Sequence, residues 1–218
     1  MLTVGLTGGI ATGKSLVTTL LRERGAGIVD ADQIYHELLG SSTELLVAMR
    51  SAFGPEIFDG NGHLDRRKLA ARVFSEPKDR QRLNQITHPV IVDEMLARMD
   101  RLLSENLSLP LVFMVVPLLF EVRFQGMVDK TVLVYAPAQV QLERLMARER
   151  LSGDEARRRL GAQMPIEEKR KLADIVIDNS GSVEQTAEQL RTVLDQLVLE
   201  SLKPGRKKRD PDLNGWKP

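Results

Sequence analysis

Residues 8–15 have the residue types and spacing of a phosphate-binding loop. The pattern is G-x-x-x-x-G-K-[ST], with Gly8, Gly13, Lys14 and Ser15 in the fixed positions. Glycine allows a polyphosphate to approach the backbone closely, the backbone N–H groups bind its oxygens, and a lysine at this spacing reaches the β- and γ-phosphates. The serine hydroxyl is the expected ligand of a phosphate-bound Mg²⁺. The pattern predicts nucleoside triphosphate binding, and the alternative is a glycine-rich turn without a ligand.

Two carboxylates follow a second short apolar run. Asp30 ends the run 27–30, and Asp32 comes two residues later. In open α/β sheets ligands bind beyond the carboxyl ends of the strands, so Asp32 is placed to orient an acceptor hydroxyl and take its proton. Asp30 would support Asp32 or contact a metal ion through water. The alternative for either residue is a helix N-cap.

Two arginines four residues apart form a further candidate pair. Arg144 and Arg148 would share one face of a helix. Arginine neutralises charge that develops on a transferring phosphoryl group better than a flexible lysine does. The alternative is a solvated helix face, on which Glu143 and Glu149 are the partners.

The elements expected to position these residues alternate between strands and helices, which favours a parallel sheet covered on both faces. The predicted strands are 2–7, 27–30, 111–116, 131–135 and 175–178. The predicted helices are 14–24, 44–53, 66–74, 77–104 and 182–202. The fold class is therefore α/β, a P-loop NTPase-type five-stranded parallel sheet with two helical inserts.

The inserts define the predicted domain organisation. Residues 1–40, 105–137 and 172–202 would form the nucleotide-binding core, residues 41–104 an acceptor-binding insert, and residues 138–171 a lid. Residues 203–218 are polar and basic, and we expect them to be disordered. A core with two such inserts favours a small-molecule kinase, because phosphoryl transfer must exclude water.

Composition argues against several other classes of protein. The 218 residues are 42% hydrophobic with a net charge of +1, which argues against a dedicated nucleic-acid binder. The absence of cysteine excludes disulfides and fits a reducing compartment. The apolar run 107–120 is broken by Pro110 and Pro117 and is too short to span a membrane. No secretory signal is recognised, so we expect a cytoplasmic protein.

Several strings outside the loop occur in a specific order beside Thr7-Gly8-Gly9-Ile10. They are Val29-Asp30-Ala31-Asp32, Leu64-Asp65-Arg66, Val73-Phe74, His88-Pro89, Val116-Pro117-Leu118-Leu119-Phe120-Glu121, Gln141 with Arg144, Arg148 and Gln163, and Ile177-Asp178-Asn179. In order and approximate spacing the set resembles the dephospho-CoA kinase family over residues 1–202. The resemblance implies that ATP, with Mg²⁺, phosphorylates the ribose 3′-hydroxyl of dephospho-CoA to give coenzyme A.

The resemblance also implies roles for single residues. The ATP site would comprise Gly8, Gly9, Ile10, Ala11, Thr12, Gly13, Lys14, Ser15, Leu16 and Asn179, the last near the adenine edge. The acceptor site would comprise Asp32, Arg66, His88, Pro117, Leu118 and Glu121. Lys14, Asp32, Arg144 and Arg148 would act in catalysis, with Ser15 on Mg²⁺. His88 could instead be structural, and Asn179 could instead form a strand-to-helix turn.

The sequence departs from the family pattern inside the loop. Leu16 stands where a hydroxyl residue is common, and Ala11-Thr12 replaces a Gly/Ser-type pair. Lys14 and Ser15 are intact, so we expect catalysis to be retained. The departure would remove one side-chain contact to an α-phosphate.

Three alternative functions remain open. Another P-loop kinase, acting on a nucleoside or small alcohol, would share the same core motifs. A GTPase-type switch is suggested by the D-x-x-G string at Asp59, but this string lies within the helical insert and no Asn-Lys-x-Asp motif occurs. The basic residues 206–209 suggest nucleic-acid binding, although such a cluster is more often a solvated terminus.

Overall fold

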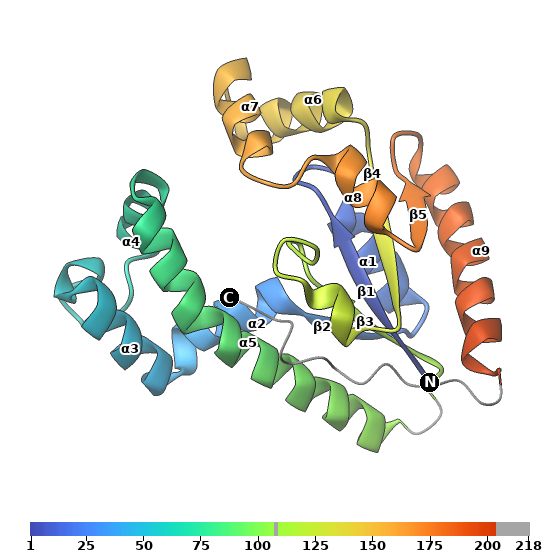
Figure 1. Ribbon diagram of the computed structural model, residues 1–218, viewed down its shortest axis with the longest axis horizontal. Coiled ribbons are helices and arrows are strands. Elements are labelled where there is room, and N and C mark those ends of the chain that lie inside the picture. The colour runs from blue at the N-terminus through green and yellow to red at the C-terminus, as the bar shows by residue number, and fades with distance from the viewer. Residues whose placement is uncertain (107–108, 204–218) are drawn as a thin grey trace. The chain divides into compact units, whose positions relative to one another are not determined.

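The computed structural model describes residues 1–106 and 109–203 (Figure 1). The predicted basic tail lies almost wholly outside these residues. The elements, in chain order, are β1 (Leu2–Gly8), α1 (Lys14–Glu23), β2 (Gly27–Asp30), α2 (Ala31–Ser41), α3 (Thr43–Phe53), η1 (Pro55–Ile57), α4 (Arg66–Ser75), α5 (Pro77–Glu105), β3 (Leu111–Val115), η2 (Phe124–Met127), β4 (Lys130–Tyr135), α6 (Ala138–Glu149), α7 (Gly153–Gly161), α8 (Ile166–Leu172), β5 (Ile175–Asp178) and α9 (Val183–Ser201).

The strands form one sheet in the order β2-β3-β1-β4-β5. β1 is parallel to both β3 and β4, and β4 is parallel to β5. The predicted parallel α/β fold is confirmed, and the five strands begin and end within one residue of their predicted bounds. Their carboxyl ends lie along the same edge of the sheet, which is where the loop after β1 begins.

Both faces of the sheet are covered, as the uninterrupted apolar runs predict. On one face, Leu2, Val4 and Leu6 of β1 belong to a cluster that includes Val17 of α1 and Leu190 of α9. Figure 1 shows α9 running alongside this sheet. On the other face, α8 packs against β4, where Leu133, Tyr135 and Ile166 form a second cluster.

The segment that follows β3 covers the centre of this second face. A Cβ on Gly5, in the middle of β1, would lie 2.5 Å from Leu119 Cδ1 and 3.1 Å from Val128 Cγ2. Glycine is therefore required here by close packing, and the segment 117–128 is held directly against β1.

Contacts within the chain separate two compact units. Among the described residues, one unit contains 1–29 and those from 102 to 203, and the other contains 30–101. The predicted acceptor-binding insert began at residue 41, so the contacts group α2 with this insert.

The second unit has its own hydrophobic core and its own ion pairs and hydrogen bonds. Leu45, Met49 and Phe53 of α3 pack with Leu39 and Leu69. Arg98 of α5 forms an ion pair of 2.6 Å with Glu37 of α2, and Arg72 of α4 pairs with Asp79 at 2.7 Å. Residues 59–62 form a turn, in which Asp59 Oδ1 accepts the backbone N–H groups of Asn61 and His63. This D-x-x-G string is a local turn closed on itself.

The long helix α5 continues through Pro89. The predicted helix 77–104 is therefore confirmed as one continuous helix. No helix in the described part of the chain is long and apolar enough to span a membrane.

Candidate active site

The loop between β1 and α1 requires glycine at two positions, Gly8 and Gly13. Gly13 has φ 88° and ends the loop at the N-terminus of α1. A Cβ on Gly8 would lie 2.6 Å from Thr12 Oγ1 and 3.0 Å from the Val134 carbonyl oxygen. Thr12 closes the loop, donating from its hydroxyl to the Gly9 carbonyl at 2.9 Å. A helix N-terminus directs backbone N–H groups and a positive dipole end toward a bound anion, so the loop and the start of α1 together form an anion-binding geometry.

Asn179 is tied to this loop by its side chain. Its Nδ2 donates to the Thr12 carbonyl at 2.7 Å, and its Oδ1 accepts from the Thr186 hydroxyl at 2.8 Å. The residue is 4% exposed, and a Cβ on Gly13 would collide with its amide. The side chain of Asn179 therefore supports the loop, a task that the sequence did not suggest. The predicted contact with adenine would therefore be made by the backbone of Asn179.

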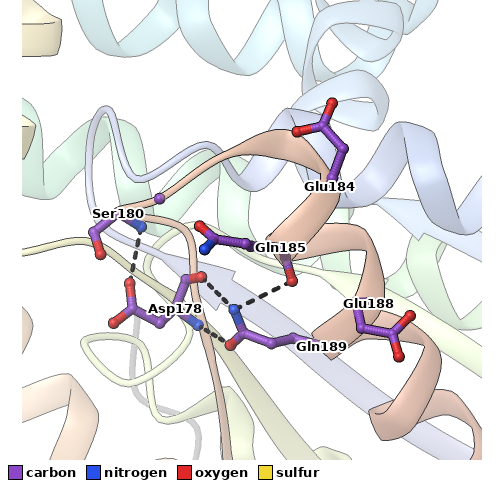
Figure 2. A pocket seen from close by; sticks show the side chains of 7 residues that line it. Asp178, Ser180, Glu184, Gln185, Glu188 and Gln189 are labelled. Atoms are coloured by element: carbon purple, nitrogen blue, oxygen red, sulfur yellow. Dashed lines mark hydrogen bonds between the residues drawn. The ribbon is translucent and has the colours of Figure 1, made fainter.

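A pocket of about 630 Å³ lies next to Asn179 (Figure 2). Gln189 donates to the Asp178 carbonyl at 2.8 Å and accepts from the Asp178 N–H at 2.9 Å. Three carboxylates line the pocket, from Asp178, Glu184 and Glu188, and no residue of the loop 8–15 does. Their negative charge would repel a polyphosphate, so this pocket is distinct from the predicted phosphate site.

The two predicted lid arginines have different surroundings, although both lie on α6. Arg148 donates to Glu149 at 2.6 Å, and Arg159 of α7 pairs with the same carboxylate. The Arg148 hydrogen bond, with Arg159 nearby, lowers the pKa of Glu149 from its ordinary value. Arg144 is partly exposed and has no hydrogen bond or ion pair with any other described residue. Arg144 is thus the one of the pair whose guanidinium is not already neutralised.

The segment after β3 holds three residues of the predicted acceptor site. The Pro117 carbonyl accepts the Thr7 hydroxyl at 3.0 Å, which ties the segment to the end of β1. Glu121 Oε1 accepts the Met164 N–H at 3.0 Å and pairs with Lys169 Nζ at 2.8 Å. Leu118, which is partly buried, begins the turn with its carbonyl bound to the Val122 N–H at 3.0 Å.

Lys169 was missed by the sequence analysis. It lies on α8 with its side chain fully buried, and its Nζ also donates to the Pro117 carbonyl at 3.2 Å. Nothing local distinguishes it from Arg170 and Lys171, which are both exposed. Burying a charged ammonium group costs free energy unless its hydrogen bonds and its charge are satisfied. Because Glu121 and Pro117 satisfy Lys169, the three groups hold one another in place.

In the second unit, the structure assigns different tasks to the two aspartates. Asp30 is the N-cap of α2, and its Oδ1 accepts the N–H groups of Asp32 at 3.0 Å and Gln33 at 3.3 Å. Asp32 lies in the first turn with an exposed side chain. The N-cap interpretation that was open for both residues therefore applies to Asp30.

Arg66 and His88 also belong to this unit. Arg66 donates to the His36 carbonyl at 3.1 Å, and its second guanidinium nitrogen lies 3.1 Å from His36 Nδ1. Burial lowers the pKa of the His88 imidazole from its ordinary value, which favours the neutral ring. The predicted site residues thus fall into two groups. Asp30, Asp32, Arg66 and His88 lie in one unit, and the remaining site residues lie in the other.

The described residues contain no group of three or more histidine, cysteine or carboxylate side chains that could hold a metal ion. Mg²⁺ often binds through one or two protein oxygens together with substrate phosphates and water. The exposed Ser15 hydroxyl at the start of α1 fits this donor set.

The family model and the sequence relatives indicate the same family. A family model described as dephospho-CoA kinase matches residues 2–185. The dephospho-CoA kinase of Carboxydothermus hydrogenoformans is 44% identical over 193 residues, which cover 88% of this chain and 93% of that protein.

Two solved structures are similar along most of their length. One is the crystal structure of TT1252 from Thermus thermophilus, with a TM-score of 0.76 and 39% identity, covering 90% of this chain and 97% of that one. The other is a dephospho-CoA kinase from Campylobacter jejuni, with a TM-score of 0.66 and 29% identity, covering 92% of this chain and 98% of that one.

Proposed function

The chain belongs to the dephospho-CoA kinase family, and from this membership we propose that it phosphorylates the ribose 3′-hydroxyl of dephospho-CoA with ATP. The observation that carries the proposal is the family match along residues 2–185, which contains both the loop 8–15 and the residues predicted to bind the acceptor. The products are coenzyme A and ADP. We also propose that the protein is located in the cytoplasm, which the cysteine-free composition fits.

In the proposed reaction the acceptor oxygen attacks the γ-phosphorus, a new P–O bond forms, and the bond to the β-phosphate oxygen breaks. Lys14 and the loop N–H groups would hold the β- and γ-phosphates, and Arg144 would neutralise charge on the transferring group. Mg²⁺, held by Ser15 and the phosphates, would supply further charge neutralisation. Asp32 would orient the 3′-hydroxyl and receive its proton.

The acceptor would be recognised through its anionic groups and its ribose. Arg66, at the start of α4, is proposed to pair with an acceptor phosphate. His88, Pro117, Leu118 and Glu121 are proposed to line the acceptor site. Because Glu121 is bound to Lys169 and to the Met164 N–H, we propose that it shapes this site instead of contacting a phosphate.

A competition between acceptors tests the function. Purified protein is supplied with ATP, Mg²⁺ and equal concentrations of dephospho-CoA, adenosine and shikimate, and each phosphorylated product is quantified. We expect dephospho-CoA to have by far the highest kcat/KM and to give coenzyme A. An equal or higher kcat/KM with adenosine would contradict the proposal and favour a nucleoside kinase.

A further inference from the structure

The peptide groups of Ile10, in the loop 8–15, are held by two glutamines from the predicted lid. Gln141 of α6 donates from Nε2 to the Ile10 carbonyl at 2.6 Å. Gln163, in the turn between α7 and α8, accepts the Ile10 N–H with its Oε1 at 2.9 Å. Both polar groups of a single residue are thus bound by side chains that follow it by 131 and 153 residues.

The neighbouring residues fit this arrangement closely. A Cβ on Gly9 would lie 2.5 Å from Gln141 Nε2, so glycine at this position lets the amide reach the loop. Gln141 is 3% exposed, and a buried amide is retained only where its hydrogen bonds are satisfied.

The residue that follows Ile10 has an unfavourable backbone conformation. Ala11 has φ 59°, in the left-handed region that residues with a Cβ disfavour. Such a conformation persists only where its surroundings fix it. The Ile10 carbonyl, bound by Gln141, belongs to the peptide unit directly before Ala11, and the Ile10 N–H, bound by Gln163, belongs to the unit before that one. The two hydrogen bonds thus fix both peptide units that precede Ala11.

We propose that Gln141 and Gln163 are positioning residues that keep the loop 8–15 in its phosphate-binding conformation against the strain at Ala11. They act through the Ile10 backbone and not on ATP itself. Loss of either side chain lets Ala11 relax to a negative φ, which moves the loop N–H groups away from the phosphates. The inference rests on the proposed function, because it takes ATP to be the ligand of this loop.

Direct binding of Mg·ATP, measured by calorimetry without an acceptor, tests the inference. Gln141→Met and Gln163→Met keep the side-chain length and remove the hydrogen bonds. Each should raise the Kd for ATP about three- to tenfold, while kcat at saturating ATP stays near that of the unchanged protein. Gln139→Met is the matched control, because Gln139 is exposed on α6 and, among the described residues, its side chain is hydrogen-bonded only to Glu143. The Kd of this variant for ATP should not change.

Substitution by glutamate separates the two hydrogen bonds. Both Gln163→Glu and Gln141→Glu add one negative charge beside Ile10. Gln163→Glu keeps the acceptor for the Ile10 N–H, whereas Gln141→Glu places a carboxylate oxygen against the Ile10 carbonyl. We therefore expect Gln141→Glu to weaken ATP binding more than Gln163→Glu does. A general loss of packing would affect the two variants alike, and equal weakening would overturn the inference.

Relief of the strain at Ala11 gives the third comparison. Glycine adopts φ 59° without a Cβ penalty, so Gln163→Met should raise the Kd less in an Ala11→Gly background than in the unchanged protein. An equal rise in both backgrounds would overturn the proposed link to Ala11.

If the unchanged protein binds ATP and the methionine variants bind it equally well, the inference fails while the proposed function stands. If the unchanged protein does not bind ATP, the proposed function fails.

Discussion

At the scale of single residues, the two aspartates after β2 allow catalysis and capping to be separated. Asp32→Asn keeps the size and a hydrogen bond to the acceptor, but it removes the negative charge and the proton acceptor. General-base contributions are about 10²–10⁴-fold, so we expect kcat to fall within this range and the KM for ATP to change little. Steady-state kinetics with dephospho-CoA and ATP measure both. A near-normal kcat would remove Asp32 from the proposed mechanism.

Asp30 supplies the matched variants for stability. Asparagine is an equally good N-cap, so Asp30→Asn should leave the free energy of unfolding unchanged, whereas Asp30→Ala should lower it by about 1 kcal/mol. The kcat of Asp30→Asn separately tests the predicted water-mediated contact of Asp30 with the metal ion.

The buried pair of Lys169 and Glu121 predicts a strong effect on stability. Lys169→Met removes the cation but leaves the Glu121 carboxylate, which is only 22% exposed, without its charged partner. Breaking such a pair costs about 3 kcal/mol, which urea unfolding would measure. The double variant Lys169→Met/Glu121→Gln should recover part of this loss, because no unpaired charge remains. If the double variant is less stable than Lys169→Met, the ion pair is not the source of the effect.

At the scale of elements, α6 carries two arginines, and the sequence could not show which of them contributes more to catalysis. Arg148 is neutralised by Glu149, whereas Arg144 has no such partner among the described residues. We expect Arg144→Ala to lower kcat by about 10²-fold or more, as is typical when a transition-state donor is removed. Arg148→Ala should have a clearly smaller effect on kcat. A larger loss for Arg148→Ala, in single-turnover assays at saturating ATP, would reverse this order.

The elements themselves were largely predictable. The five strands are continuous apolar runs, and the helices with amphipathic patterns begin and end close to their predicted bounds. The bounds of α2, α6, α7 and α8 were not predicted, and the start of α2 at Ala31 is set by the N-cap hydrogen bonds of Asp30. α5 passes through Pro89 although proline disfavours a helical conformation for the preceding residue.

At the scale of the whole molecule, burial of His88 predicts a pH-dependent stability. The unfolded chain protonates this histidine near its ordinary pKa of 6.5, whereas burial lowers the pKa in the folded state. Below about pH 6.5 the unfolded state therefore binds more protons, and the free energy of unfolding falls as the pH falls. Above this pH both states carry neutral His88, and its contribution does not vary.

Urea unfolding at pH 7.5 and 5.5 measures this dependence. His88→Gln should reduce the loss of stability between the two pH values, because it removes the titrating group. His63→Gln is the control, since the side chain of His63 is 81% exposed. An unchanged loss in His88→Gln would show that other groups cause it.

By itself the sequence determined the type of fold and the type of chemistry. Both can be recognised from local sequence patterns. A buried strand needs a continuous apolar run, and a phosphate-binding loop needs residues such as Gly8, Gly13 and Lys14 at fixed spacing. The ordered strings at Asp32, His88 and Glu121 then indicated the family, which the comparisons confirm.

Only the tertiary structure decided which side chains support the site. Gln141, Gln163 and Asn179 reach the loop from more than 130 residues away. The resemblance placed Asn179 at the ATP site, but no local pattern shows which backbone groups these three side chains bind. Lys169 is indistinguishable from the basic residues beside it until α8 packs against the sheet and buries it beside Glu121. These roles depend on which groups meet in space and on how much water is excluded, and neither quantity is encoded in the spacing of residues along a single segment.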